Sequence, residues 1–88
     1  MCTYITDQIS INGSVKGSDE WKDVDRAMVY VDHPVSAMAE HSLNIDLYNT
    51  KNGLKSRVAL ELNVDSALNL ANSIISSVEG YKKQSKLK

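Results

Sequence analysis

Phenylalanine is absent from the 88-residue chain, and tryptophan, proline and cysteine each occur once. A core without phenylalanine must be largely aliphatic. The single cysteine, Cys2, excludes an internal disulfide. No apolar run approaches the roughly 20 residues of a membrane-spanning helix. The first ten residues lack the basic start and apolar centre of a secretory signal. We therefore expect a cytoplasmic protein with no membrane partner.

Charge is nearly balanced along the chain but unevenly distributed. The last seven residues, 82–88, hold four of the ten Lys and Arg residues, which leaves six positive and eleven negative charges on the rest. An acidic body without a basic stripe is a poor match for nucleic acid, so we expect no nucleic-acid partner. We expect a single domain over 1–81 and a solvated, disordered basic tail over 82–88.

Hydrophobic periodicity divides the chain into five elements. Apolar and polar residues alternate in four segments, which predicts strands over 3–11, 26–32, 41–49 and 55–63. From Val64 the apolar spacing changes to that of an amphipathic helix, with Asn63 as a candidate N-cap and Gly80 as the stop signal. The helix should therefore end between residues 79 and 83.

This order, β-β-β-β-α, predicts an α+β fold in which the C-terminal helix packs on one face of a four-stranded antiparallel sheet. The helix should cover the face that holds Leu43, Ile45 and Leu47. The opposite face then exposes several apolar and aromatic side chains, which indicates a partner or a pocket. These side chains are Met28, Tyr30, Tyr48 and Ala59. We expect a homo-oligomer, with a dimer packed sheet to sheet as the simplest form.

The segment 12–21 is rich in glycine and polar residues and is expected to be a loop. Gly13, Ser14, Lys16 and Gly17 could present amides and an ammonium to an anion. The spacing does not match a phosphate-binding P-loop, so a flexible hairpin loop is the alternative.

The segment DHPVSAMAEH, residues 32–41, contains both histidines of the chain. If the flanking strands are antiparallel neighbours, His33 and His41 lie at the same end of the sheet. Together with Glu40 or Asp32 they would form the two-histidine, one-carboxylate set that binds several divalent metals. A metal-free alternative is acid-base chemistry by one histidine with Glu40 or Asp46. A third alternative is that both histidines only cap strands.

A second polar cluster lies further along the predicted third strand. Asn44 and Asp46 share a face with Tyr48, and Arg57 and Glu61 are expected across the next hairpin. Polar groups beside apolar walls are typical of small-molecule sites, whereas a solvated face with cross-strand ion pairs is the structural alternative.

Four blocks of the sequence, MCTY, NGSVKG, VYVDHPVSAMAEHSLNID and RVALEL, occur in an order that resembles a family of small bacterial proteins known only as a domain of unknown function. The likeness extends from Met1 to about Ile75 and departs at Val15, where the family has a small residue, which weakens the anion-binding hypothesis. The resemblance implies no reaction. It implies that six residues form one site, namely Cys2, His33, Glu40, His41, Asn44 and Asp46.

The leading hypothesis is a site that binds a divalent metal or a small polar ligand, with acid-base catalysis as an added activity. The catalytic candidates are His33, Glu40, His41 and Asp46, of which His33, Glu40 and His41 are the metal candidates. Ligand contacts are expected from Cys2, Asn44, Tyr48 and Lys16. Strand alternation places His41 and Asp46 on opposite faces, so one site holding both needs a strand end or a bulge. The competing hypothesis is a non-catalytic, homo-oligomeric interaction module that docks a partner on its exposed sheet face.

Overall fold

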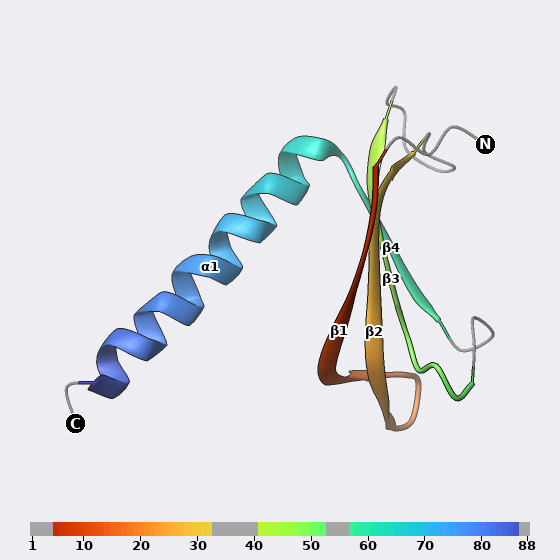
Figure 1. Ribbon diagram of the computed structural model, residues 1–88, viewed down its shortest axis with the longest axis horizontal. Coiled ribbons are helices and arrows are strands. Elements are labelled where there is room, and N and C mark those ends of the chain that lie inside the picture. The colour runs from red at the N-terminus through yellow and green to blue at the C-terminus, as the bar shows by residue number, and fades with distance from the viewer. Residues whose placement is uncertain (1–4, 33–40, 53–56, 87–88) are drawn as a thin grey trace.

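The computed structural model describes residues 5–32, 41–52 and 57–86 and confirms the element order β-β-β-β-α. The strands form one antiparallel sheet in the order β1-β2-β3-β4, which is also their order in the chain (Figure 1). The five elements are β1 (Ile5–Lys16), β2 (Trp21–Asp32), β3 (Ser42–Tyr48), β4 (Val58–Leu62) and α1 (Val64–Lys86).

The first hairpin is longer than the sequence indicates. Residues 12–16 and 21–25, expected to be loop or unassigned, continue the strands until Lys16 pairs with Trp21. The turn between them closes with a hydrogen bond of 2.8 Å from the Gly17 amide to the Glu20 carbonyl. A shift of register between Ser10 and Gly13 inserts one extra residue into β1, which is a β-bulge. The loop prediction for 12–21 was wrong because glycine at a bulge looks, by composition, like glycine in a loop.

The strand register separates the sheet into two faces of different character. The polar face carries hydrogen-bonding side chains beside tyrosines, and its central members are Gln8, Arg26, Met28, Tyr30, Asn44, Asp46 and Tyr48. The apolar face carries aliphatic side chains, and its members on the described strands include Ile9, Ala27, Val29, Val31, Leu43, Ile45, Leu47, Val58, Leu60 and Leu62. Asp7, which pairs with Val29, is a charged residue on the apolar face.

The sequence predicts a covered apolar face and an exposed polar face, and residues on both faces depart from this expectation. On the polar face, Ser42, Asp46 and Tyr48 are buried. On the apolar face, Ile9, Val58 and Leu60 are exposed. Tyr48, predicted to be an exposed aromatic, is therefore one of the more protected side chains of the sheet.

The helix begins as predicted and ends later. The Asn63 side chain accepts a hydrogen bond of 2.7 Å from the Ser66 amide, so Asn63 is the N-cap. Gly80 lies inside the helix, and its prediction as the stop was wrong. One glycine in a helix interior costs only about 1 kcal/mol relative to alanine, which good helix formers on either side can offset. The helix continues to Lys86, through the first part of the basic tail.

The helix does not pack along the sheet. It contacts the sheet only near its start and then diverges from the strands (Figure 1). Its large apolar side chains are exposed, namely Val64, Leu68, Leu70, Ile74, Ile75, Val78 and Tyr81. The radius of gyration is 15.2 Å, against about 12 Å for a compact domain of this length. The prediction that α1 covers one sheet face was therefore wrong. Within the described residues, no helix has the length and apolar character needed to cross a membrane.

The turn that follows β3 is fastened to β2 by side chains. The Thr50 amide and hydroxyl donate to the two carboxylate oxygens of Asp25 at 2.9 and 2.7 Å. The side-chain amide of Asn49 donates to the backbone carbonyl of Asp23 at 3.2 Å. The hydrogen bond from the Thr50 hydroxyl is the largest cause that lowers the pKa of Asp25 from 3.8, and the Thr50 amide adds to it.

A carboxyl group whose pKa is lower in the folded chain stabilises the fold above its unfolded pKa, and that contribution is lost as the pH falls through the folded pKa. We expect Asp25→Asn to lower the unfolding free energy near neutral pH, and we expect this effect to shrink as the pH falls below 3.8 toward the lower folded pKa. Urea unfolding at a fixed protein concentration, at about pH 7 and about pH 3, measures the difference. Asp19→Asn, in the exposed first turn, is the matched control. An Asp25→Asn deficit that stays constant with pH would contradict the assignment.

Candidate ligand-binding site

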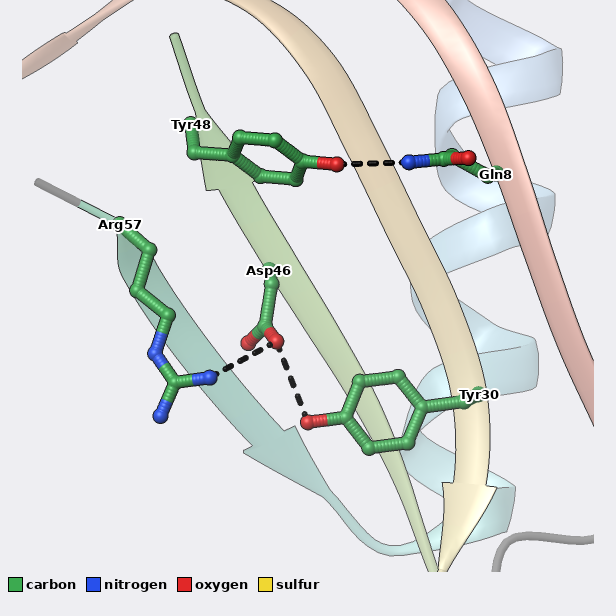
Figure 2. Close-up of polar contacts among 5 residues, drawn as sticks. All are labelled: Gln8, Tyr30, Asp46, Tyr48 and Arg57. Carbon is green, nitrogen blue, oxygen red and sulfur yellow. Dashed lines mark hydrogen bonds and ion pairs between the residues drawn. The ribbon is translucent and has the colours of Figure 1, made fainter. Parts of the chain in front are cut away.

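A pocket of about 260 Å³ opens on the polar face over β2, β3 and β4. Its centre is Asp46, which pairs with Met28 on one side and Ala59 on the other. Tyr30 and Arg57 approach Asp46 from the two neighbouring strand regions (Figure 2). The helix passes behind the sheet in this view, on the side away from the pocket. The lining residues are Tyr30, Asn44, Asp46, Arg57, Ala59, Leu60 and Glu61.

Asp46 is a buried carboxylate with only one of its two oxygens bonded. Oδ2 accepts hydrogen bonds from the Tyr30 hydroxyl at 3.2 Å and from the Arg57 guanidinium at 3.3 Å. Oδ1 is buried and has no hydrogen-bond partner among the described residues. The Asp46 side chain is 4% exposed, whereas that of Arg57 is 49% exposed. Because an unpaired buried acceptor costs free energy, Oδ1 favours a bound hydrogen-bond donor.

Other hydrogen bonds on the polar face hold the side chains around the pocket. The Ser42 hydroxyl has two acceptors within reach, the Asn44 Oδ1 at 2.7 Å and the Asp32 carbonyl at 3.3 Å. Since the shorter bond engages the oxygen of Asn44, its amide nitrogen is the group left to donate toward the pocket that Asn44 lines. The Gln8 amide donates to the Tyr48 hydroxyl at 2.7 Å, across β2 (Figure 2).

A second unsatisfied polar atom lies beside this network. Arg26 lies opposite Tyr48 in the strand register. Its side-chain Nε is buried and has no hydrogen-bond partner in the described part of the chain. Arg26 and Asp46 are diagonal neighbours on the polar face, because Tyr48 and Asp46 are two residues apart on β3. The polar face thus holds one unsatisfied donor and one unsatisfied acceptor near each other, which is unusual for buried groups without a bound molecule.

The structure brings some of the predicted residues together and separates others. Asn44 and Asp46 line the same pocket, and Tyr48 lies next to them on the polar face. Lys16 pairs with Trp21, which is roughly 23 Å along β2 from Met28 at the pocket. The anion-binding segment expected at Gly13–Gly17 is instead strand as far as Lys16, and Gly17 enters the turn.

His41 and Asp46 are not neighbours. They are five residues apart, or roughly 16 Å along an extended strand, and an odd separation directs their side chains to opposite faces. Residues 42–48 of β3 pair with β2 in unbroken register, and His41 directly precedes them at the end of the strand. A single site that includes both residues stays a prediction. Cys2, His33 and Glu40 lie outside the part of the chain that the structure describes.

No group of three His, Cys, Asp or Glu side chains capable of holding a metal occurs within residues 5–32, 41–52 and 57–86. The metal set expected from His33, Glu40 and His41 includes only one described residue, His41, which directly precedes β3. The predicted metal site thus stays a prediction.

Sequence reasoning placed Arg57 in the polar cluster but missed the role of Tyr30. Tyr30 was assigned to an exposed apolar surface, yet its hydroxyl donates to Asp46. The signal in the sequence was that Tyr30 alternates along its strand with the same face as Arg26 and Met28. Its cross-strand partner on that face is Asn44. That partner follows only from the register between β2 and β3.

The family model that matches this chain covers residues 1–87 and describes a family of unknown function, DUF6295. The chain belongs to DUF6295. The match confirms the resemblance expected from the four sequence blocks. No match was found among curated proteins, nor among solved structures. DUF6295 membership assigns no reaction to the candidate residues.

The Tyr48–Gln8 hydrogen bond can be tested without disturbing the shape of the polar face. Tyr48→Phe removes the hydroxyl from a buried ring, and we expect the unfolding free energy to fall by about 1 kcal/mol. Urea unfolding measures the change, with Tyr81→Phe as the control because Tyr81 is 71% exposed. A Gln8→Ala variant should lose a similar amount, and the double variant less than the sum. Equal effects of Tyr48→Phe and Tyr81→Phe would contradict this role.

Proposed function

We propose that this DUF6295 protein binds a small polar molecule in the pocket around Asp46. The observation that carries the proposal is the buried carboxylate of Asp46, a residue that lines an open pocket and whose Oδ1 has no partner among the described residues. A hydrogen-bond donor from a ligand would satisfy this oxygen.

The charges of the pocket limit the class of ligand. Asp46 and Glu61 contribute two negative charges and Arg57 one positive charge. This balance favours a ligand that brings an ammonium, amide or hydroxyl donor to Asp46. The Arg57 guanidinium, half exposed, is suited to a carboxylate or carbonyl of the same ligand.

The volume limits the size of the ligand. The pocket measures about 260 Å³, just below the range of about 300–1,000 Å³ that is usual for drug-sized ligands. A compact molecule with a donor and an acceptor a few bonds apart, such as an amino acid or a hydroxy acid, matches both the volume and the charges. Proton transfer by Asp46 or by His41 stays a prediction from the sequence and is not needed for binding.

The test uses free amino acids and the corresponding hydroxy acids as probes, with amide and side-chain NMR spectra of the whole chain as the readout. We expect a saturable shift of the Arg57 Nε–H signal and of the Asn44 side-chain amide. At about 100 times the dissociation constant, a bound probe should add about 2.7 kcal/mol to the unfolding free energy.

Matched variants separate the pocket from the rest of the surface. Asp46→Asn keeps the shape but removes the charge, and Arg57→Gln removes the guanidinium; we expect each to weaken binding at least about tenfold, or about 1.4 kcal/mol. Lys51→Gln removes one positive charge from an exposed turn and should leave binding unchanged. Far-UV circular dichroism verifies that each variant is folded. Binding that survives in both folded pocket variants, or no response to any probe, would refute the proposal.

The interaction-module hypothesis places its docking surface on the face that holds Met28 and Tyr30, which is the face of the pocket. The exposed aliphatic side chains of the apolar face and of α1 offer a second surface for such a partner. Ligand binding on the polar face and docking on the apolar face are therefore compatible in one molecule.

A further inference from the structure

Two large apolar surfaces of this chain are uncovered. The first is the apolar face of the sheet, on which Ile9 is 47% exposed and Leu60 is 43% exposed. The second is a stripe along α1, defined by helical spacing and made of Val64, Ala67, Leu68, Ala71, Ile74, Ile75 and Val78. Ile75, near the middle of this stripe, is 54% exposed. Exposure on this scale indicates an interaction surface.

The chain buries little apolar surface by itself. Among the residues that the structure describes, the buried apolar side chains are Val24, Ala27 and Tyr48. A domain of this size depends on a filled core or on association with another chain. The missing core contacts are those between the apolar face and a helix.

The connection between β4 and α1 is short. Only Asn63 separates Leu62, the last residue of β4, from Val64, the first of α1. Asn63 is also fixed on the helix side, because its side chain bonds the Ser66 amide and its carbonyl accepts from the Ala67 amide at 3.0 Å. These bonds fix where the helix starts, and from this one-residue connection the helix runs away from the strands (Figure 1).

We infer that a second copy of the chain supplies the missing layer, with the α1 stripe of each chain packed on the apolar sheet face of the other. The exchange is reciprocal, so both surfaces of both chains are covered in one closed dimer. The lengths agree: a 23-residue helix is roughly 35 Å long, and a 12-residue β2 strand is roughly 40 Å long. This inference does not rest on the ligand proposal, since the pocket lies on the opposite face.

The area is sufficient for a stable dimer. Burying an aliphatic side chain removes on the order of 100 Å² from water. Covering two half-exposed stripes and two sheet faces then buries on the order of 1,000 Å² of apolar surface, and the surrounding polar atoms bring the total to about the 1,200–2,000 Å² of specific interfaces.

The charges of the two surfaces are complementary. Residues 1–63 carry six positive and nine negative side chains, or −3, whereas residues 64–88 carry four positive and two negative, or +2, which together give the net −1. Lys82 continues the α1 stripe beyond Val78 by helical spacing. Asp7, the acidic residue on the apolar face, lies on the edge strand β1. A helix from a second copy thus brings lysines to an acidic sheet.

Sedimentation equilibrium over a dilution series tests the association. We expect the wild-type chain at twice its 9.7 kDa mass. Leu68→Asp combined with Ile75→Asp should shift it toward the mass of one chain. The matched control is Asn69→Asp combined with Ser73→Asp, which adds the same charge on the other side of the helix and should leave the dimer intact. A monomeric wild-type chain would overturn the inference.

Charge reversal provides a test that does not depend on stripe variants remaining folded. Asp7→Lys should weaken the dimer by about threefold or more, and adding Lys82→Glu should restore part of that loss, as expected for a coupled pair of sites. If the combined variant is weaker than Asp7→Lys alone, Asp7 does not face the helix of the second copy.

The arrangement is tested on unmodified protein by mixing isotope-labelled and unlabelled chains and recording isotope-filtered methyl NOEs. We expect contacts between the Ile74 and Ile75 methyls of one chain and the Ile9, Ile45 or Leu60 methyls of the other. Helix-to-sheet contacts found only within one chain would show that the helix folds back on its own sheet. Contacts between chains only through Met28 and Tyr30 would show sheet-to-sheet packing on the polar face. Either result would overturn the exchange.

Discussion

The one-residue connection at Asn63 is the constraint on which the rest of the structure depends. Because β4 ends at Leu62 and α1 starts at Val64, the helix has almost no freedom in the direction it takes. The N-cap hydrogen bond to the Ser66 amide marks the start of the helix directly after this connection. The result is a sheet whose aliphatic face stays open and a helix whose aliphatic stripe stays open. The two surfaces match each other, and a second chain is the simplest way to bring them together.

The opposite face of the sheet follows a different principle. Its side chains bury polar groups and satisfy most of them with each other, through Tyr30–Asp46, Arg57–Asp46 and Gln8–Tyr48. The exceptions are Asp46 Oδ1 and Arg26 Nε. Leaving buried polar atoms unpaired lowers stability, so their concentration beside a pocket is more typical of a binding surface than of a structural core. The two faces thus differ in character, because the polar face holds a pocket beside unpaired buried polar atoms and the apolar face exposes aliphatic side chains.

Several features of the fold could be predicted because they follow from local patterns. Alternation along β3 identified Asn44, Asp46 and Tyr48 as one face, and the change of period at Val64 identified the start of the helix. The predictions that depended on composition were less successful. The segment 12–21 contains glycine and polar residues but extends two strands around a bulge, and Gly80 did not end the helix. In both places the neighbouring hydrogen bonds outweighed the preference of a single residue.

The sequence by itself determined the family, the order of the elements and the partition of strand residues between two faces, because each of these is recorded in consecutive residues. Only the tertiary structure decided which face is buried and which side chains meet. Tyr30 reaches Asp46 because β2 and β3 pair in one register. The direction of the helix likewise depends on the geometry of a single capped residue, which a hydrophobic pattern does not encode.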